Sequence, residues 1–470
     1  MIERKHLYIN GQWVAPDADH SITLINPATE DFTARVVLGN SVDVDRAVSA
    51  ARDAFKSWSK TSSAERAVYI HAVHEKMVER RQELVDVISS TMGCPPHIAQ
   101  SIQVDGPTHA MSLFAFRAAL MDGRKRVANS LVVREAVGVC GFINPWNYPL
   151  HQLVAKVGAA LAAGCTMVVK PSEQTPLQDF IMADIFHEVG LPPGVFNLVN
   201  GLGAEVGNAI ASHEGIDMVS FTGSVAGGIS VAKAAAPTVK RVTQELGGKS
   251  PYIITRDADL EAAVRYGVDN VMINSGQTCT ALTRMLVPAE LQTHAVAIAK
   301  KHAVGLVVGM GEHAFLGPLS SSIHRERVRA SIAAGIAEGA TLVTGGVEAP
   351  SDHAHGFYAQ PTIFSNVKNS MVIAREEIFG PVLCILPYDT IEEAIGMAND
   401  NDYGLSSAVW AGSEDEAMGI ARQLQAGLCY LQGAAFNYHA PFGGCKKSGN
   451  GREYGDEGVH EFIELKSIQL

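Results

Sequence analysis

Cysteines are few in this sequence, and their placement excludes two kinds of site. The 470 residues include seven, an odd number, without a Cys-x-x-Cys pair or a histidine at zinc-finger spacing. This pattern argues against a disulfide framework and against a metal site, and it favours a reducing compartment. The sequence opens without an apolar signal segment. We therefore expect a cytoplasmic protein.

Basic residues and long apolar runs are also scarce. The 37 Lys and Arg residues stand against 49 Asp and Glu, which gives a formal charge of -12 and leaves no basic run to attract nucleic acid. The longest apolar stretch, residues 153–169, is interrupted by Lys156 and by glycines, so it falls short of a membrane span. We predict neither a nucleic-acid partner nor a membrane partner.

Regularly spaced apolar segments predict a parallel β-sheet. They begin 22 to 29 residues apart, with helical patterns between them, and cover residues 139–143, 166–169, 195–199, 217–221 and 240–244. The segments are apolar throughout, as expected of strands that helices cover on both faces. Ahead of them, helices are predicted over residues 44–58 and, after a Ser62-x-x-Glu65 capping box, through Met77 towards Ile88.

A second series after Gly247-Gly248 predicts another α/β unit. It contains a helix near residues 259–275 and strands near 284–288, 382–387 and 428–431. Two more strand-like segments, residues 131–133 and 462–465, fit neither sheet. Such strands commonly pair with each other or with another subunit, so we expect an oligomerisation element.

Three loops at predicted strand ends are candidates for binding a dinucleotide. Gly201-Leu202-Gly203 with Gly207 is one residue longer than the usual glycine fingerprint and follows the third strand, so alone it is a weak signal. Residues 221–224 end a strand and begin a helix, which presents free backbone N–H groups to a phosphate. Residues 170–173 offer a Lys and a Glu to ribose hydroxyls, or they form a solvated loop with an ion pair.

Three side chains stand out as chemically useful. Cys279 lies in a small polar turn after a helix, whereas Cys140 and Cys165 are expected to be buried in strands. Glu245 ends a strand, where parallel-sheet enzymes place catalytic groups, although a single Glu is more often a surface charge. Asn147 stands between two prolines, which would hold its amide ready for an oxyanion.

These segments together resemble the NAD(P)-dependent aldehyde dehydrogenase superfamily. Seven motifs follow its order, at residues 144–149, 170–173, 221–224, 245–248, 276–279, 377–381 and 441–444. The resemblance runs from residue 7 to 470, and the separation of 34 residues between Glu245 and Cys279 is also similar. It implies an α/β fold with a Rossmann-type dinucleotide-binding domain, an α/β catalytic domain and a small β oligomerisation element.

The resemblance also implies a division of the chain and an assembly. The NAD-binding domain would comprise residues 1–117 and 137–246, and the catalytic domain residues 247–446. The oligomerisation element would comprise residues 118–136 and 447–470. The implied assembly is a homodimer or a homotetramer.

By position, the resemblance assigns the chemistry to four residues. Cys279 resembles the nucleophile that forms a thiohemiacetal and then a thioester, and Asn147 resembles the amide that holds the oxyanion. Glu245 resembles the base that activates water to release a carboxylic acid, and Lys156 resembles a residue that supports proton transfer and the nicotinamide ribose. Two alternatives stay open: an acylating enzyme that uses coenzyme A, and a catalytically inactive NAD-binding relative. Retention of Glu245 favours hydrolysis.

The implied cofactor is NAD. Glu377 and Phe379 match residues at the nicotinamide ribose and ring, and Lys170 and Glu173 match those at the adenosine ribose. A carboxylate at position 173 would accept from a free 2′-hydroxyl and repel a 2′-phosphate, so we favour NAD over NADP. The full set of implied cofactor contacts is Ile143, Asn144, Pro145, Trp146, Lys170, Ser172, Glu173, Gly203, Gly207, Phe221, Thr222, Gly223, Ser224, Glu245, Leu246, Gly247, Glu377 and Phe379.

We predict an apolar or aromatic aldehyde as the substrate, because aromatic walls suit such groups. The alternative is that these rings only pack the loop around residue 438. Ala155 stands where enzymes acting on acidic semialdehydes often carry Arg, which argues against a dicarboxylate semialdehyde. The predicted pocket residues are Tyr148, His151, Gln152, Ala155, Thr278, Thr280, Phe436 and Phe442, with Tyr438 and His439 as further candidates.

Overall fold

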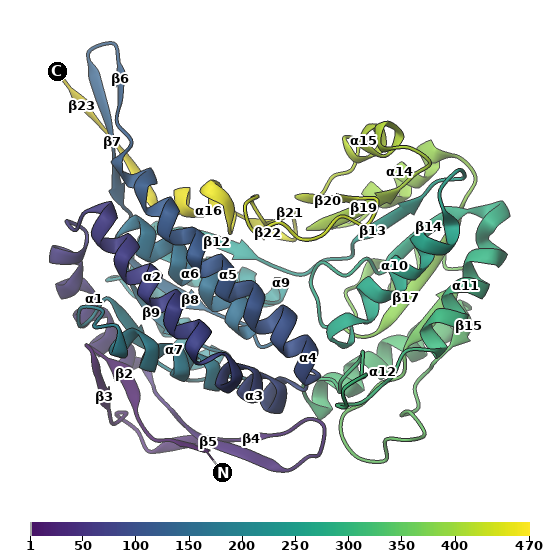
Figure 1. Cartoon of the computed structure of the whole chain (residues 1–470), viewed down its shortest axis with the longest axis horizontal. Coiled ribbons are helices and arrows are strands. Elements are labelled where there is room, and N and C mark those ends of the chain that lie inside the picture. Colours follow the sequence, from purple (N-terminus) through teal and green to yellow (C-terminus); the bar gives the residue numbers. More distant parts are fainter. Residues whose placement is uncertain (1) are drawn as a thin grey trace.

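The computed structural model describes residues 2–470, which form two lobes, each built on a mostly parallel sheet (Figure 1). The five predicted apolar segments are the centre of the first sheet. They are β8 (Val139–Ile143), β9 (Thr166–Lys170), β10 (Phe196–Leu198), β11 (Met218–Thr222) and β12 (Arg241–Glu245). They pair in parallel in the order β12-β11-β8-β9-β10. The predicted parallel sheet is confirmed.

Helices cover both faces of this sheet, which explains why its strands are apolar throughout. Val139 and Val168 pack in one core with α1 (Ser41–Trp58), α8 (Asn208–Ser212) and α9 (Val225–Ala235). Cys140 and Met167, one residue along each strand, pack in the opposite core with α6 (Pro149–Ala163) and α7 (Leu177–Glu188). An outer layer of helices lies over these two: α2 (Ser63–Glu79) and α5 (Asp105–Arg117) pack on α6, and α3 (Arg81–Met92), which is followed by the short α4 (Pro96–Ile98), packs on α7.

The long helix expected from Ser62 towards Ile88 is in fact two helices, so that prediction was wrong. The chain leaves the helical conformation at Arg80, where φ is -94° and ψ is 17°. The expected capping box is half present, since Ser62 Oγ accepts from the Glu65 amide at 3.1 Å without a return bond from the Glu65 side chain. At this break Arg80 makes ion pairs with Glu83 and Glu188.

The segment that begins at Leu7 is strand-like in the sequence and forms a strand, whereas the other short strands beside the central sheet were not predicted. β2 (Leu7–Ile9) and β3 (Gln12–Val14) extend the first sheet beyond β10, and β22 (Gly449–Asn450) closes its other edge. β1 (Ile2–Arg4), β4 (His20–Ile25) and β5 (Phe32–Leu38) form a separate sheet. β1 and most of β4 are only partly buried, so they lack the apolar runs that mark the central strands.

The second lobe contains a seven-stranded sheet in the order β15-β16-β17-β14-β13-β19-β20. Its strands are β13 (Pro251–Ile254), β14 (Arg284–Pro288), β15 (Thr341–Thr344), β16 (Thr362–Ser365), β17 (Val382–Tyr388), β19 (Ser406–Trp410) and β20 (Leu428–Leu431). Its helices are α10 (Leu260–Met272), α11 (Gln292–Val304), α12 (Ser322–Ala337), α13 (Val372–Arg375), α14 (Ile391–Asn399) and α15 (Glu414–Ala421). The three strands predicted for this unit are confirmed, as β14, β17 and β20.

The two strand-like segments that fitted neither sheet pair with each other. β7 (Ser130–Ala136) and β23 (Ile463–Gln469) form an antiparallel ladder, and β6 (Lys125–Val127) adds a third strand. This three-strand arm projects from the first lobe and carries the carboxyl terminus (Figure 1). The arm follows α16 (Gly455–His460), and the short pair β18 (Tyr403–Gly404) and β21 (Cys445–Lys446) lies beside β22. The residue boundaries of the three predicted units stay a prediction.

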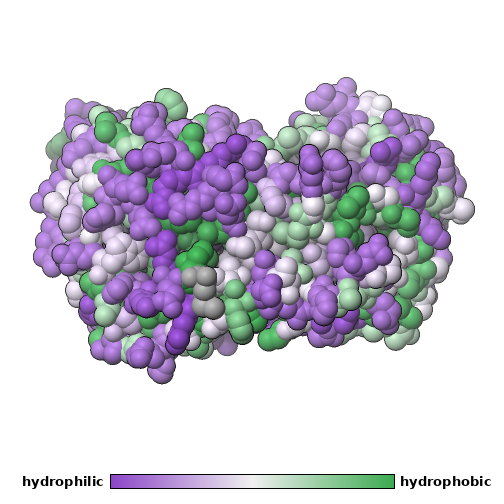
Figure 2. Space-filling view, turned by 60° about the horizontal axis from the view of Figure 1, so that its bottom comes forward, coloured by the Kyte–Doolittle hydropathy of each residue, from purple (hydrophilic) through white to green (hydrophobic). Residues whose placement is uncertain are grey.

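The outer surface is mainly hydrophilic in the view of Figure 2, with smaller hydrophobic patches scattered over both lobes. Across residues 2–470, every helix is too short or too polar to traverse a lipid bilayer.

Candidate active site

A strained turn carries Cys279. The helix expected over residues 259–275 ends earlier, at Met272, because Asn274 and Ser275 adopt positive φ angles of 54° and 57°. Gly276 follows with φ at 74°, and a Cβ there would lie 2.0 Å from the Gly380 carbonyl oxygen, so only glycine fits. The turn reverses the chain and presents Cys279 at the junction of the two lobes.

Buried amides hold this turn against the loop that follows β8. Asn147 Nδ2 donates to the Gln277 carbonyl at 3.0 Å, and Asn274 Nδ2 donates to the Asn147 carbonyl at 3.1 Å. Gln103, which is fully buried, donates to the same Asn147 carbonyl at 3.0 Å. Sequence reasoning missed Gln103 and Asn274, since neither belongs to a recognisable motif. These bonds make Asn147 and Cys279 parts of one rigid unit.

Glu245 is a buried carboxylate in an unusual state. It ends β12, is 6% exposed, and neither carboxylate oxygen has a hydrogen-bond partner in the described chain. Burial raises the pKa of Glu245 well above its ordinary value, and the charge of Glu453 raises it further, while Lys156 and Arg452 act in the opposite direction. An uncompensated carboxyl of raised pKa beside a nucleophile has the properties of a general base.

Lys156 lies beside this carboxyl in a buried ion pair. Its Nζ donates to Glu453 Oε1 at 2.7 Å and to Thr222 Oγ1 at 2.8 Å, and the side chain is 1% exposed. Glu453 comes from the chain just before α16 and was not predicted. Its backbone pairs with that of Phe442 at 2.7 Å in both directions, which brings this distant segment to the site.

The surroundings of Cys279 disfavour its thiolate form. Burial raises the pKa of Cys279, and the negative charges of Glu377, Glu245 and Glu453 raise it further. A nucleophile in this state reacts only when its proton is taken up by a nearby base or when a cationic group enters the site.

Two cavities meet at Cys279. The first, of about 290 Å³, lies at the carboxyl ends of β8, β11 and β12 and is closed by α12 and the segment Glu377–Phe379. It is lined by Pro145, Trp146, Asn147, Gln152, Thr222, Gly223, Ser224, Glu245, Leu246, Gly247, Cys279, His324, Arg327, Ser331, Glu377, Ile378 and Phe379. The second, of about 350 Å³, extends from Cys279 towards the loop around Tyr438. Cys279 and Gln152 line both cavities.

Two glycines keep the first cavity open. A Cβ on Gly247 would lie 2.3 Å from Glu377 Oε2, and a Cβ on Gly223 would lie 2.7 Å from the Phe221 ring. Glu377 accepts from the Gly248 amide at 2.9 Å, and its burial raises the pKa of Glu377 to about 7. Bare backbone beside a carboxylate suits a ligand with phosphate and ribose groups.

His324 is a residue of this cavity that the sequence analysis missed. Its Nε2–H donates to the Phe379 carbonyl at 2.7 Å, and its ring stands edge-on to Trp146 at 5.2 Å. Trp146 also contacts the Phe379 ring at 5.5 Å. A single His in a helix pattern carries no sequence signal of this role, because it depends on the packing of α12 against the segment after α13.

The remaining predicted cofactor residues lie along the same sheet edge, outside the first cavity. Lys170 Nζ donates to Glu173 Oε2 at 3.0 Å, and the backbone N–H of Asn144 donates to the Lys170 carbonyl at 3.0 Å. The Asn144 side chain is buried with both polar atoms lacking a partner among residues 2–470. Ile143 and Ser172 are buried beside these groups, and Gly207 faces Lys170, while the space at Gly203 is open.

Most of the predicted pocket residues line the second cavity. These are Tyr148, His151, Gln152, Thr278, Thr280, Phe436 and Phe442, joined by Ile102, Tyr266, Asn270, Ile273, Tyr430, Tyr438, Glu453 and Tyr454. Ala155 does not line this cavity. It lies on α6 one turn after His151, on the same face of the helix, but its short side chain is 1% exposed and packs in the core.

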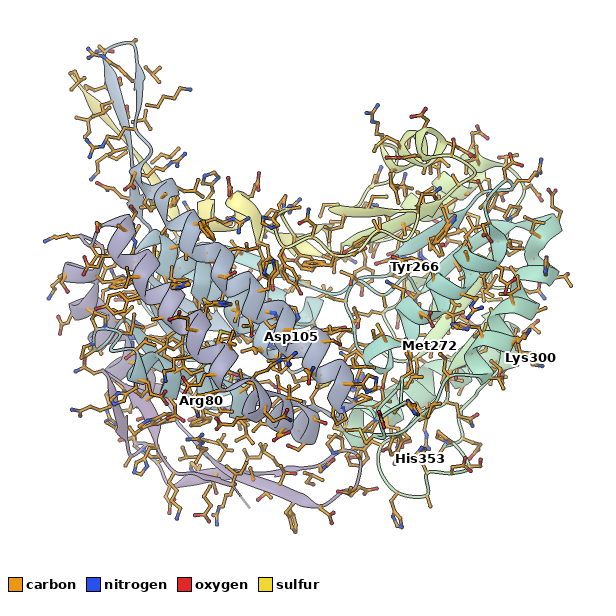
Figure 3. All side chains as sticks on the ribbon, viewed as in Figure 1. Arg80, Asp105, Tyr266, Met272, Lys300 and His353 are labelled. Atoms are coloured by element: carbon orange, nitrogen blue, oxygen red, sulfur yellow. The ribbon has the colours of Figure 1, made fainter. Side chains whose placement is uncertain are left out.

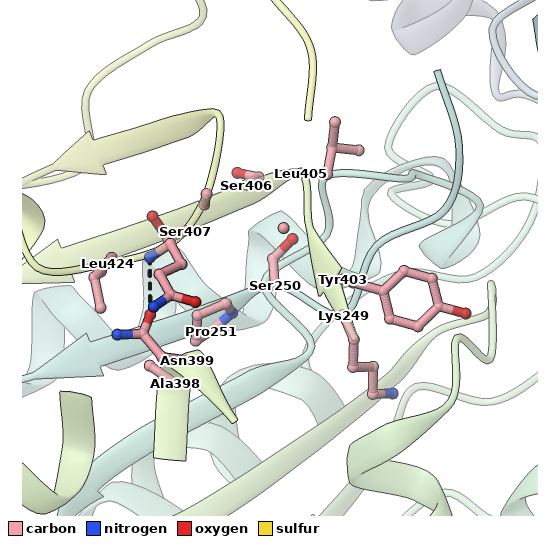
Figure 4. Close-up of a pocket in the computed structure, with 13 residues that line it drawn as sticks. Lys249, Ser250, Pro251, Ala398, Asn399, Tyr403, Leu405, Ser406, Ser407 and Leu424 are labelled. Atoms are coloured by element: carbon pink, nitrogen blue, oxygen red, sulfur yellow. Dashed lines mark hydrogen bonds between the residues drawn. The ribbon is translucent and has the colours of Figure 1, made fainter. Parts of the chain in front are cut away.

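A third, small pocket lies in the second lobe between α14, β18 and β19 (Figure 4). Its volume of about 10 Å³ holds roughly one water molecule. Figure 4 shows Lys249 and Tyr403 on one side of the pocket and Asn399 on the other. The backbone N–H of Gln425 donates to Asn399 Oδ1 at 2.8 Å. It contains neither Cys279 nor Glu245, so it is not part of the reaction site.

Comparison with known proteins agrees with this geometry. A family model described as the aldehyde dehydrogenase family matches residues 13–468. The chain belongs to the aldehyde dehydrogenase family. It is 48% identical to a 3-succinoylsemialdehyde-pyridine dehydrogenase of a Pseudomonas species, over 100% of this chain and 99% of that protein.

Solved aldehyde dehydrogenases superpose closely on this fold. One is a mutant of aldehyde dehydrogenase C from Pseudomonas syringae in complex with NAD+ and octanal, with a TM-score of 0.98 and 49% identity over 99% of this chain and 96% of that one. Another is the Mycobacterium tuberculosis enzyme complexed with NAD+, with a TM-score of 0.97 and 42% identity over 100% and 98% of the two chains. The predicted family and the predicted fold class are confirmed.

Proposed function

We propose that this aldehyde dehydrogenase oxidises an apolar or aromatic aldehyde to its carboxylic acid with NAD, and that Cys279 is the nucleophile. The observation that carries the proposal is the position of Cys279. Among the described residues, only Cys279 and Gln152 line both cavities. An aldehyde in one cavity and a dinucleotide in the other would meet at its thiol. The NAD+ and octanal complex of the Pseudomonas syringae relative supports this division.

Asn147 is suited to stabilise the first intermediate. A base, for which Glu245 is suited, takes the proton of the Cys279 thiol and passes it to solvent. Cys279 Sγ then bonds to the aldehyde carbon, and the carbonyl oxygen becomes the oxyanion of a thiohemiacetal. One N–H of the Asn147 amide is committed to the Gln277 carbonyl at 3.0 Å, which leaves the second N–H for the oxyanion. The Cys279 backbone N–H would supply the other donor.

The first cavity fits NAD. NAD held there would supply the acceptor for the hydride that leaves when the thiohemiacetal becomes a thioester. Glu377 would hold ribose hydroxyls, and the bare backbone at Gly223 and Gly247 leaves room for the cofactor. The Trp146, His324 and Phe379 rings enclose one wall and keep water out.

Glu245 would complete the reaction. It takes a proton from a water molecule whose oxygen bonds to the thioester carbon, and the carbon–sulfur bond breaks to release the acid and the Cys279 thiolate. Both Glu245 oxygens lack a partner in residues 2–470, so they are free to bind that water. The Lys156–Glu453 pair lies next to it and supports the charge that develops. This base favours hydrolysis over transfer to coenzyme A.

The aromatic wall supports the proposed substrate class. The Phe436 ring lies 5.8 Å from Phe442 and 4.7 Å from Tyr438, and Tyr438 lies 5.4 Å from Tyr454. The pyridine substrate named for the Pseudomonas relative and the octanal of the solved complex both agree with an apolar cavity.

We also propose that the protein forms a homodimer or homotetramer through the arm. Leu465 on β23 and Leu470 just after it are 68% and 65% exposed, and one edge of β23 is unpaired within the described chain. Such an edge is a site for a second copy of the sheet. Sedimentation of the full chain and of Leu465→Glu tests this, since the substitution should lower the assembled mass.

Product analysis tests the proposed reaction and its alternatives. The protein is incubated with NAD and octanal, with and without coenzyme A. We expect NADH and octanoic acid in equal amounts in both reactions. Octanoyl-coenzyme A as the main product would show an acylating enzyme, and binding of NAD without NADH formation from any aldehyde of a broad panel would show an inactive relative.

A further inference from the structure

The two sides of the second cavity differ in chemistry. One side is the aromatic wall, made by Phe436, Tyr438, Phe442 and Tyr454. The other side comes from the second lobe, where α10 contributes Tyr266 and Asn270 and β20 contributes Tyr430. Tyr266, labelled in Figure 3, extends from α10 and packs against Trp410 with ring centroids 5.7 Å apart.

The groups on this second side carry hydrogen-bond donors without partners. The hydroxyls of Tyr266 and Tyr430 make no hydrogen bond within residues 2–470, and both side chains are half-buried. Two other tyrosines of this cavity have partners: the Tyr148 hydroxyl bonds to Thr278 Oγ1 at 2.8 Å, and the Tyr454 hydroxyl donates to the His151 carbonyl at 3.4 Å. The Tyr438 hydroxyl on the aromatic wall also has no partner among the described residues, so the cavity offers several hydroxyls that a bound molecule could pair.

Asn270 shows which kind of partner is missing. Its Oδ1 accepts from the Leu282 amide at 2.9 Å, which fixes the side-chain orientation because a backbone N–H requires an acceptor. The Nδ2 end is then left at the cavity surface, and an amide NH₂ can only donate. The Nδ2 group can therefore form a hydrogen bond only with an acceptor on the bound molecule.

The three donors lie close together and close to the nucleophile. Tyr266 and Asn270 are four residues apart on α10, so they lie on the same face of the helix. Burial raises the pKa of Tyr430, and its neighbours Tyr266 and Cys279 raise it further, which agrees with a compact group. The Leu282 amide bonded by Asn270 is three residues after Cys279.

We propose that this enzyme selects aldehydes whose tail carries a hydrogen-bond acceptor, such as a ketone oxygen or a ring nitrogen, bound by Tyr266, Asn270 and Tyr430. This rests on the proposed function and narrows its substrate class. When a plain hydrocarbon tail binds, it displaces water from the three donors but accepts no hydrogen bond from them. The tail therefore binds with lower affinity. A site built with such donors discriminates more strongly than an apolar wall does. The aromatic wall would pack the apolar remainder of the tail.

Matched substrates test the proposal directly. Initial rates of NADH formation are measured with octanal and with its 4-oxo, 5-oxo and 6-oxo analogues, which differ only in one ketone oxygen. We expect the kcat/KM of the best oxo-aldehyde to exceed that of octanal at least several-fold. Equal or lower values for all three analogues would overturn the proposal. Absence of NADH with all four aldehydes would instead overturn the proposed function.

Three substitutions test whether the donors cause the preference for oxo-aldehydes over octanal. Tyr266→Phe and Tyr430→Phe remove one hydroxyl each, and Asn270→Asp removes the donor while it retains an oxygen for the Leu282 amide. Each should lower the ratio of kcat/KM for the preferred oxo-aldehyde to that for octanal by about 2- to 10-fold, mainly through the KM of the oxo-aldehyde. Equal losses on both substrates in all three would overturn the assignment. Tyr358→Phe is the control, since Tyr358 lines neither cavity.

Discussion

The Asn147 side chain donates a hydrogen bond to the carbonyl of Gln277 at 3.0 Å, two residues before Cys279. The bond joins the loop after β8 to the turn after α10, which belong to different lobes. Because Asn274 and Gln103 bond back to the Asn147 carbonyl, the amide cannot shift without disturbing the turn. The oxyanion donor and the nucleophile are therefore fixed relative to each other before substrate arrives.

Removing this donor should slow the chemical step. Asn147→Ala is expected to lower kcat by about 10²- to 10³-fold, the usual loss when one oxyanion donor is deleted. Steady-state NADH formation with octanal checks this. Asn366→Ala, at an exposed position of the second lobe, serves as the control and should leave kcat unchanged. A full-rate Asn147→Ala enzyme would show that the oxyanion is held elsewhere.

Substitution of Glu245 should stop the reaction after hydride transfer. Glu245→Gln is expected to give a rapid burst of NADH, one per active site at most, followed by a very slow steady rate because the thioester persists. A stopped-flow trace measures both phases, and Glu414→Gln on α15 is the control. A variant that turns over at the wild-type rate would remove Glu245 from the mechanism.

The pH profile of the wild-type enzyme should report the same group. Burial raises the pKa of Glu245, so its base form appears only at pH values well above those at which an exposed Glu ionises. Steady-state turnover should therefore increase as pH rises through this pKa, and Glu245→Gln should lack that increase.

The central sheet was predictable from local sequence patterns, whereas the assignment of Cys279, Glu245 and Asn147 to one site came from the resemblance to a family and stays a prediction. Unbroken apolar segments such as residues 139–143 mark doubly covered strands, and motif residues stand at their ends. Glu453, His324 and Gln103 were not predictable, since each reaches the site by packing of an element far away in the chain. The break at Arg80, where an ion pair joins this residue to Glu188 of α7, left no signal in the helix pattern.

Glu173 should control the choice between NAD and NADP. Its carboxylate is partly exposed beside Lys170, at 3.0 Å, where it would repel a 2′-phosphate. We expect Glu173→Ser to raise the ratio of kcat/KM for NADP to that for NAD at least tenfold, since one like charge is removed and Lys170 is freed. Glu205→Ser, in the turn after β10, is a control on the same lobe. An unchanged ratio would contradict this assignment.

Asp179 should make stability depend on pH. This carboxyl on α7 is 2% exposed, and its burial raises the pKa of Asp179 to about 8. A folded-state pKa above that of the unfolded chain means that its stabilising effect is fully present below about pH 4 and is lost as pH rises towards 8. Asp179→Asn should therefore raise Tm, by an amount that grows between those pH values. A constant difference in Tm across this range would contradict the assigned pKa.

The most direct test of the account is NADH formation by the wild-type protein and by Cys279→Ala over a panel of aliphatic, aromatic and acidic aldehydes. Cys445→Ala, at another partly exposed cysteine, is the matched control. We predict turnover with apolar and aromatic aldehydes in the wild type and in Cys445→Ala, and none in Cys279→Ala, with NAD binding intact in all three. Turnover that survives Cys279→Ala would contradict the central claim that this thiol carries the reaction.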